Sequence, residues 1–200
     1  MTSKVEETKH FILKTVSPIF NKKGYTATSM TDITSATKLT KGAIYGNFKN
    51  KEALAVQAFN FNIRFIIDKI RVIFDEIESP LKKLNALTNF YRTYYKQTIE
   101  FGGCPILNVG IDANNNNPEL FTRVKEVATK LTNSITQIIN EGQIKKEIKT
   151  NINPEVYGGR IFSLIEGSIF TSVLLKNDTY LIDMMNHIDN MIENELKITT

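Results

Sequence analysis

The hexapeptide TKGAIY, which begins at Thr40, carries the side chains best suited to contact another molecule. Thr40 and Tyr45 have hydroxyl groups, and Lys41 has a positive charge. Such groups donate hydrogen bonds to phosphate oxygens and to the edges of bases. Gly42 has no side chain that would hold the backbone away from a partner. The helix predicted over residues 41–47, of about two turns, has the size that enters the major groove of DNA.

The first 51 residues contain no arginine, which limits how this segment could read bases. Because the commonest specific contact joins arginine to guanine, Lys41 must supply any guanine contact here. Lysine is a flexible point charge and discriminates geometry less well than arginine. Asn47 is expected to reach a phosphate or an adenine edge. Lys51 begins a helix whose free N-terminal amides favour a phosphate.

Two short helices joined by a tight turn are predicted around the hexapeptide, because two sets of apolar residues have helical spacing. Ser29 is expected to cap the first helix, with Asp32 reaching back to it. Thr40 should cap the second helix, and Asn50 the long helix that follows. This pattern predicts a helix-turn-helix. The apolar sets are Met30, Ile33 and Ala36, then Leu39, Ala43 and Ile44.

This stretch resembles the DNA-binding domain of the tetracycline-repressor (TetR/AcrR) family of bacterial transcription regulators. The resemblance covers about residues 5–55 and is carried by many positions at fixed spacing. It implies that Thr28 and Ser29 lie close to DNA and that Tyr45 contacts a phosphate. The matching positions are Gly24, Tyr25, Thr28, Met30, Ile33, residues 40–45, Phe48 and residues 51–54.

Two positions depart from the pattern. Family members usually have glycine where this chain has Lys38, since the turn favours a left-handed residue. Lysine in that conformation costs roughly 1 kcal/mol, but it gains a position near the DNA backbone. Pro18 lies inside the first predicted helix, where it removes a backbone hydrogen bond and should bend the helix.

Charge is distributed unevenly along the chain. Residues 1–51 carry nine lysines against three acidic residues, a net charge of +6, whereas the remainder has a net charge of −2. The positive charge therefore coincides with the segment that would face phosphates. We expect a helix-turn-helix DNA-binding domain over residues 1–50 and a ligand-binding and dimerisation domain over residues 51–200.

The whole chain is predicted to be all-α, with about nine helices, because no strand pattern competes with the helical periodicity. The first helix should place Phe11, Ile12, Val16, Ile19 and Phe20 on its inner face. Proline and glycine punctuate the later helices, and Asp178 is expected to cap the last one. The helices outside the helix-turn-helix are predicted over residues 5–23, 51–78, 80–101, 105–113, 118–140, 154–175 and 179–196.

A stripe of small residues recurs every four positions in the penultimate helix. Small side chains at this spacing let another helix approach closely, and glycine within a helix costs about 1 kcal/mol unless packing compensates. The resemblance implies that the last two helices form a four-helix interface in a homodimer; tight packing within one subunit is the alternative. The predicted interface residues are Gly159, Ser163, Gly167, Phe170, Thr171, Met184 and Ile188.

The middle helices are rich in aromatic residues, and the resemblance implies that they enclose a cavity for a small, hydrophobic or aromatic effector. For each candidate taken singly, a place in the plain core is the more common alternative. Glu166, a charge on an apolar helix, could pair with a cationic ligand, with Arg92 or Arg160, or lie at the dimer interface. The candidate lining residues are Tyr91, Tyr94, Tyr95, Asn108, Phe162 and Glu166.

Other functions find little support in the sequence. The only histidines, His10 and His187, have no neighbouring nucleophile, and the single cysteine, Cys104, has no metal-binding spacing. We therefore expect no catalysis, no metal and no cofactor. With no export signal or membrane span expected, the predicted location is the cytoplasm.

The sequence predicts a ligand-responsive transcriptional regulator, a repressor that binds a pseudo-palindromic operator as a homodimer and is released by a small molecule. The alternative is a helical dimeric interaction protein without sequence-specific DNA binding, whose helix-turn-helix pattern serves only packing.

Overall fold

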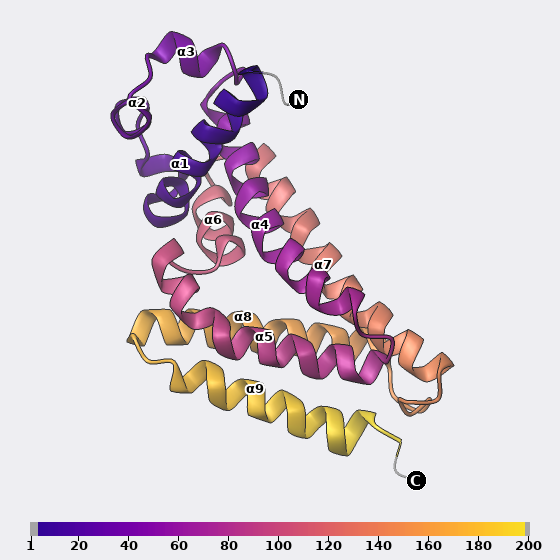
Figure 1. Ribbon diagram of the computed structural model, residues 1–200. Coiled ribbons are helices and arrows are strands. Elements are labelled where there is room, and N and C mark those ends of the chain that lie inside the picture. Colours follow the sequence, from indigo (N-terminus) through magenta and orange to yellow (C-terminus); the bar gives the residue numbers. More distant parts are fainter. Residues whose placement is uncertain (1–3, 199–200) are drawn as a thin grey trace. The chain divides into compact units, whose positions relative to one another are not determined.

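The computed structural model describes residues 4–198, in which the regular elements are nine α-helices and one π-helical turn (Figure 1). The β pairing found there is a single isolated bridge between Ile148 and Lys197. The all-α prediction is thus confirmed. The elements are α1 (Lys4–Ala27), α2 (Met30–Thr37), α3 (Lys41–Tyr45), α4 (Lys51–Asp75), α5 (Pro80–Phe101), α6 (Pro105–Ala113), α7 (Pro118–Ile144), α8 (Pro154–Leu175), α9 (Thr179–Met191) and the π-turn η1 (Ile192–Leu196).

The chain divides into two compact units. Unit 1 comprises Met1–Ile66 and Phe101–Glu126, and unit 2 comprises Ile67–Glu100 and Val127–Thr200. Unit 1 therefore holds α1, α2, α3 and α6 with the first parts of α4 and α7. The division predicted at residue 50 followed the helix-turn-helix alone, whereas the structural unit adds α6 and the helix segments beside it.

In unit 1, α1 packs against α6 and α2. Its inner face buries Ile12, Val16 and Phe20, as predicted, but Phe11 is 47% exposed, so its assignment to that face was wrong. The helix is continuous through Pro18 and its backbone departs from helical geometry at Gly24 (φ 82°, ψ 166°). The predicted stop at Gly24 is therefore a break within α1.

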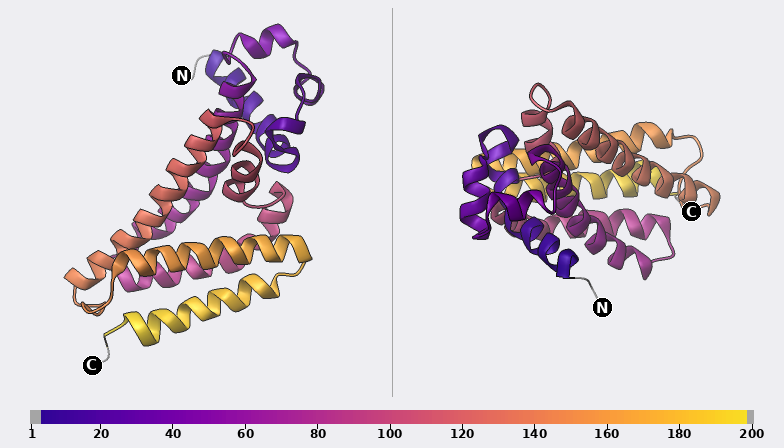
Figure 2. Two further views of the ribbon diagram at one scale, coloured as in Figure 1. Left: turned by 180° about the vertical axis from the view of Figure 1, so that it is seen from behind. Right: turned by 90° about the horizontal axis from the view of Figure 1, so that it is seen from above.

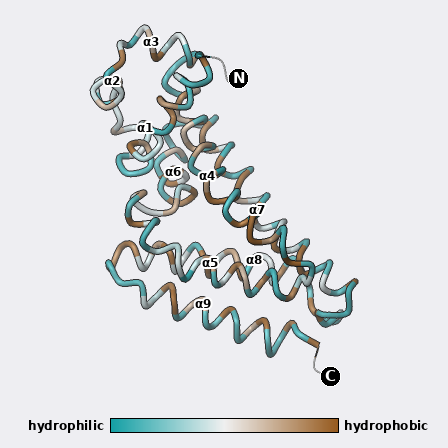
Figure 3. Tube along the Cα trace, in the orientation of Figure 1, coloured by the Kyte–Doolittle hydropathy of each residue, from teal (hydrophilic) through white to brown (hydrophobic). Residues whose placement is uncertain are grey.

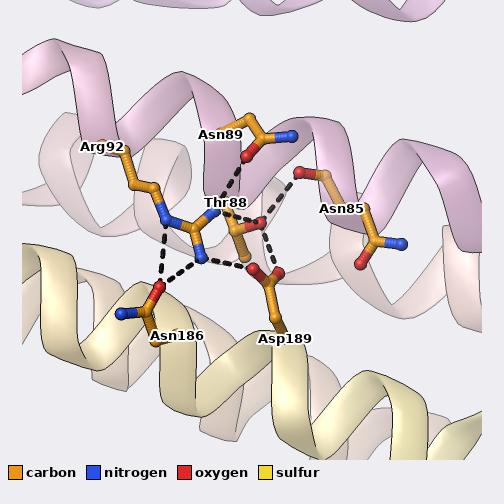
Figure 4. A network of polar contacts seen from close by, with 6 residues as sticks. All are labelled: Asn85, Thr88, Asn89, Arg92, Asn186 and Asp189. Atoms are coloured by element: carbon orange, nitrogen blue, oxygen red, sulfur yellow. Dashed lines mark hydrogen bonds and ion pairs between the residues drawn. The ribbon is translucent and has the colours of Figure 1, made fainter.

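In unit 2, α9 runs alongside α8 (Figures 1 and 2). A polar network joins α5 to α9 (Figure 4): Arg92 pairs with Asp189, whose other carboxylate oxygen accepts a 2.6 Å hydrogen bond from the Thr88 hydroxyl. Gly158 brings α8 against α7, because a Cβ there would lie 2.2 Å from Oγ1 of Thr136.

Most helix starts are where the sequence places them. Proline occupies the first position of α5, α6, α7 and α8, as predicted. α9 also starts at Thr179, as predicted, but the Asp178 side chain makes no capping hydrogen bond. Asn177 takes that role, since its Oδ1 accepts from the backbone nitrogen of Thr179 at 3.0 Å.

Apolar residues recur along the faces of the helices (Figure 3), and α8 is the most apolar of the long ones. By length and composition alone, α8 is the one helix in the described part of the chain that could cross a membrane. About 39% of its most apolar window is buried inside the protein, and core helices of soluble proteins meet the same criterion.

Candidate nucleic-acid interface

The start of α2 is held by a reciprocal pair of hydrogen bonds. Oγ of Ser29 accepts from the backbone nitrogen of Asp32 at 3.1 Å, and the Asp32 carboxylate accepts from the backbone nitrogen of Ser29 at 2.8 Å. Lys23 pairs with the same carboxylate at 2.8 Å. Hydrogen bonds from Lys23 and then from Ser29 hold the pKa of Asp32 below its ordinary value. The predicted capping box is confirmed.

The turn between α2 and α3 has the predicted left-handed residue. Lys38 has φ 59° and ψ 22°, and its side chain is exposed. α3 then begins at Lys41 and is capped by Thr40, whose Oγ1 accepts from the backbone nitrogen of Ala43 at 3.1 Å. Because the hydroxyl acts as acceptor in this cap, its hydrogen can still be donated to a phosphate.

α3 buries one side and exposes the other. Ile44 is completely buried, whereas Lys41 and Gly42 are exposed and the Tyr45 side chain is 45% exposed. Only the Thr40 hydroxyl comes within 4 Å of a Cβ built on Gly42, so this part of the helix surface is open. The exposed face combines a cation, a phenol and accessible backbone, as DNA contact would require.

Two predicted contact residues do not face solvent in this way. Thr28 is completely buried and its hydroxyl donates to the carbonyl of Gly24 at 2.7 Å. Asn47 turns back on α3, because its Nδ2 donates to the carbonyl of Ala43 at 2.9 Å. α3 also ends at Tyr45 and not at Asn47. We therefore withdraw Thr28 and Asn47 as direct contacts.

Lys51 begins α4, as predicted, with Asn50 capping the helix through a 2.8 Å hydrogen bond from the backbone nitrogen of Ala53. The Lys51 ammonium donates to the carbonyl of Tyr25 at 2.7 Å and lies 4.3 Å from the centre of the Tyr25 ring. Burial lowers its pKa. A phosphate contact would use one of the remaining N–H groups of the ammonium.

Comparison with known families decides whether the helix-turn-helix belongs to a DNA-binding regulator or serves only packing. Residues 80–188 match the family described as "Tetracyclin repressor-like, C-terminal domain". Residues 12–58 match the one described as "Bacterial regulatory proteins, tetR family". The chain belongs to the TetR family. It is therefore a DNA-binding transcriptional regulator and not an enzyme.

Relatives of this TetR-family chain match along most of its length. The HTH-type transcriptional repressor DhaR of Mycobacterium sp. (strain GP1) is 23% identical over 160 residues, covering 80% of this chain and 79% of DhaR. A TetR-family regulator from Cytophaga hutchinsonii is 28% identical, with a TM-score of 0.87 and 100% of both chains covered. A TetR regulator from Chloroflexus aurantiacus is 27% identical, with a TM-score of 0.90 and 98% and 99% covered.

Unit 2 of this TetR-family chain contains a small apolar cavity of about 70 Å³, bounded by parts of α4, α5, α7 and α8. Tyr91 and Phe162 line it, as predicted, together with Leu87, Leu131 and Ile135.

The other four predicted effector residues do not line this cavity. Tyr94 is buried and stacks on Phe90, and the Tyr95 hydroxyl donates to the carbonyl of Ser172 at 3.4 Å. Glu166 is buried on α8. Asn108 belongs to unit 1, where its side chain donates to backbone carbonyls. Aromatic content identified the right helices but not the direction of each side chain.

The small-residue stripe of α8 is open in the single chain. Nothing lies within 4 Å of a Cβ built on Gly159 or Gly167, and Ser163 and Phe170 are exposed. Thr171 and Met184 are partly exposed. Ile188 is completely buried within the subunit, so its assignment to the interface was wrong.

Sequence reasoning missed two features of this face. Leu174 and Leu175 extend its apolar surface, at 64% and 54% exposure, and their apolar type alone would have suggested burial. It also gave no role to Gly158, which packs against α7, although it listed the outward-facing Gly159 in the predicted interface. The four-residue spacing accounts for that choice, since only Gly159 shares it with Ser163 and Gly167.

Proposed function

We propose that this regulator is a homodimeric repressor that binds a pseudo-palindromic operator and is released from it by a small apolar molecule. The open face of α8 carries the proposal. Glycine inside a helix costs about 1 kcal/mol relative to alanine, and at Gly159 and Gly167 no packing within the subunit offsets that cost. Close approach of a second helix from another copy would offset it.

A dimer also follows from the small size of the DNA-reading surface. α3 has five residues and exposes only a few side chains, so one copy would read few base pairs. Two copies related by a two-fold axis would read two half-sites, and the operator would then share that symmetry. The proposed contact residues are Ser29, Lys38, Thr40, Lys41, Gly42, Tyr45 and Lys51.

The effector part of the proposal rests on the cavity in unit 2. At about 70 Å³ it is smaller than the roughly 150 Å³ cavity that accepts benzene in an engineered protein core. An effector that fills it must therefore favour a form in which the cavity is wider. Such a ligand shifts the population toward that form and lowers operator affinity. That the regulator represses transcription is suggested by the name of its relative, the transcriptional repressor DhaR. We place the protein in the cytoplasm, where an operator-binding protein meets its DNA.

The test begins with duplexes that the wild-type protein selects from a random library. Band shifts should show two copies on each selected duplex, and a library of small aromatic compounds should contain members that both raise the melting temperature and weaken binding. A compound at a hundredfold excess over its dissociation constant stabilises the fold by about 2.7 kcal/mol.

A cavity-filling variant provides the specific control. Leu131→Phe places a larger side chain at the cavity wall, whereas Ile144→Phe adds the same group at an exposed position of the same helix. Leu131→Phe should bind operator but lose the response to the compound, and Ile144→Phe should keep both. A dimer that binds selected and random duplexes equally would instead support the interaction-protein alternative.

A further inference from the structure

The break in α1 leaves backbone groups that need partners. At Gly24 the chain leaves helical geometry, so the bond from the Tyr25 nitrogen to the Asn21 carbonyl, four residues earlier, cannot form in the ordinary way. The bond from the Thr26 nitrogen to the carbonyl four residues earlier is lost in the same way, although Thr26 itself is exposed. Buried or half-buried groups of this kind cost free energy unless another element satisfies them.

α6 satisfies both sides of the break. Nδ2 of Asn108 donates to the carbonyl of Asn21 at 3.2 Å. Oδ2 of Asp112 accepts from the nitrogens of Tyr25 and Thr26, at 2.5 and 3.2 Å. Asn108 and Asp112 are four residues apart and so lie on one face of the helix. One side of α6 therefore caps the end of one segment of α1 and the start of the next.

The junction is also tightly packed. The Asn21 side chain is buried and donates to the carbonyls of Phe101 and Gly103, at 2.6 and 3.0 Å. A Cβ on Gly103 would lie 2.8 Å from Nδ2 of Asn108, and one on Gly24 would lie 3.0 Å from Cγ of Asp112. There is little room for the break to take another conformation while α6 stays in place.

From the break the chain leads directly into the helix-turn-helix. The carbonyl of Gly24 accepts from the Thr28 hydroxyl, and the carbonyl of Tyr25 accepts from the Lys51 ammonium, both at 2.7 Å. Ser29, which directly follows Thr28, caps α2. The bonds from α6 thus hold the segment from which α2 and α3 start, and all these residues belong to unit 1.

We propose that Asp112 and Asn108 on α6 are positioning residues for operator binding, because they hold the break in α1 that sets the course of the chain into α2 and α3. They touch no DNA themselves. The inference rests on the proposed role of α3 as the reading helix. It implies that any change that moves α6 away from the break lowers specific operator affinity without changing the contact surface of α3.

Three variants test the inference on the full chain: Asp112→Ala, Asp112→Asn, which keeps one acceptor oxygen, and Asp75→Ala, which removes the same charge from an exposed position. The measurements are affinity for the selected duplex and for a random duplex, and hydrogen exchange at the amides of Tyr25 and Thr26. Circular dichroism checks that each variant is folded.

Asp112→Ala should lose about tenfold or more in affinity for the selected duplex, with Asp112→Asn between it and wild type. Random-duplex affinity should be unchanged or slightly higher, because removing a negative charge reduces repulsion from phosphates. The two amides should exchange faster in Asp112→Ala. Asp75→Ala should match wild type in each measurement.

Equal operator affinity in folded Asp112→Ala and wild type would overturn the inference. So would equal losses on selected and random duplexes. If Asp112→Ala does not fold, Asp112→Asn decides: a lower affinity for the selected duplex alone supports the role, and wild-type affinity with faster amide exchange refutes it. A wild-type protein that selects no duplex at all would instead refute the proposed function.

Discussion

Replacement of Gly167 tests whether the open face of α8 is an interface. In the single chain, Gly167 is exposed and nothing lies within 4 Å of a Cβ at this position, so the Cβ of Gly167→Leu meets no obstacle inside the subunit. The neighbouring exposed residues Ser163 and Phe170 leave the same face free. Any large effect of the substitution must therefore arise from contact with another molecule.

The expected loss of association free energy follows from the two-fold symmetry of the proposed dimer. Overpacking a close contact costs about 1–3 kcal/mol, and a two-fold axis places the substitution in the interface twice. The cost to association is then about 2–6 kcal/mol, which raises the dimer dissociation constant by roughly 30-fold to 10⁴-fold. Within the subunit, replacing this glycine gains up to about 1 kcal/mol of helix propensity, an effect of opposite sign.

Sedimentation equilibrium over a range of protein concentrations measures the dissociation constant. Gln137→Leu adds the same side chain at an exposed position of α7 and serves as the matched control. Gly167→Ala adds only a methyl group and should weaken association less than leucine does. A Gly167→Leu protein that remains as dimeric as wild type at every concentration would remove Gly167 from the interface and refute the argument from the open stripe.

Three further outcomes are expected. Lys41→Ala should cost about 1–3 kcal/mol in binding to the selected duplex and much less on random DNA, measured by fluorescence anisotropy; equal losses would remove Lys41 from base readout. Gly158→Ala should lower the free energy of unfolding in denaturant by about 1–3 kcal/mol, because its Cβ would lie 2.2 Å from Oγ1 of Thr136, and unchanged stability would show that α7 and α8 can separate. The pKa of Asp32 is lowered, so the stability that its bonds provide is present above the ordinary carboxyl value and is lost as pH falls toward the lower value in the folded protein. Melting temperatures across this acid range should therefore fall more steeply for wild type than for Asp32→Asn, and parallel curves would contradict the assignment.

The starts of the helices could be predicted because their causes are local. Ser29, Thr40 and Asn50 cap the helices that follow them within three residues, and proline can be accommodated at a first helical position. Helix ends were less predictable: α4 ends at Asp75 and not near residue 78, and α7 continues to Ile144.

The candidate DNA-contacting face could also be predicted only in part. That Gly42 is exposed follows from its place on the side of a short helix opposite the buried Ile44, whereas the exposure of Lys41 and Tyr45 is seen only in the structure. Thr28 and Asn47 were misplaced because their polar groups can bond either to a partner or to a nearby carbonyl, and residue type does not distinguish these outcomes.

The all-α fold and the helix-turn-helix could be predicted from the sequence alone, since they depend on spacing and capping within a few residues, and the family resemblance followed from the matching positions of residues 5–55. Only the tertiary structure showed that Gly158 packs against α7 and that Ile188 is buried, because both lie on helices with apolar residues on more than one face. The role of Asp112 likewise depended on packing. Its hydrogen bond to Tyr25 spans 87 residues of chain, and no local pattern specifies which backbone amides a distant carboxylate will meet once the helices have packed.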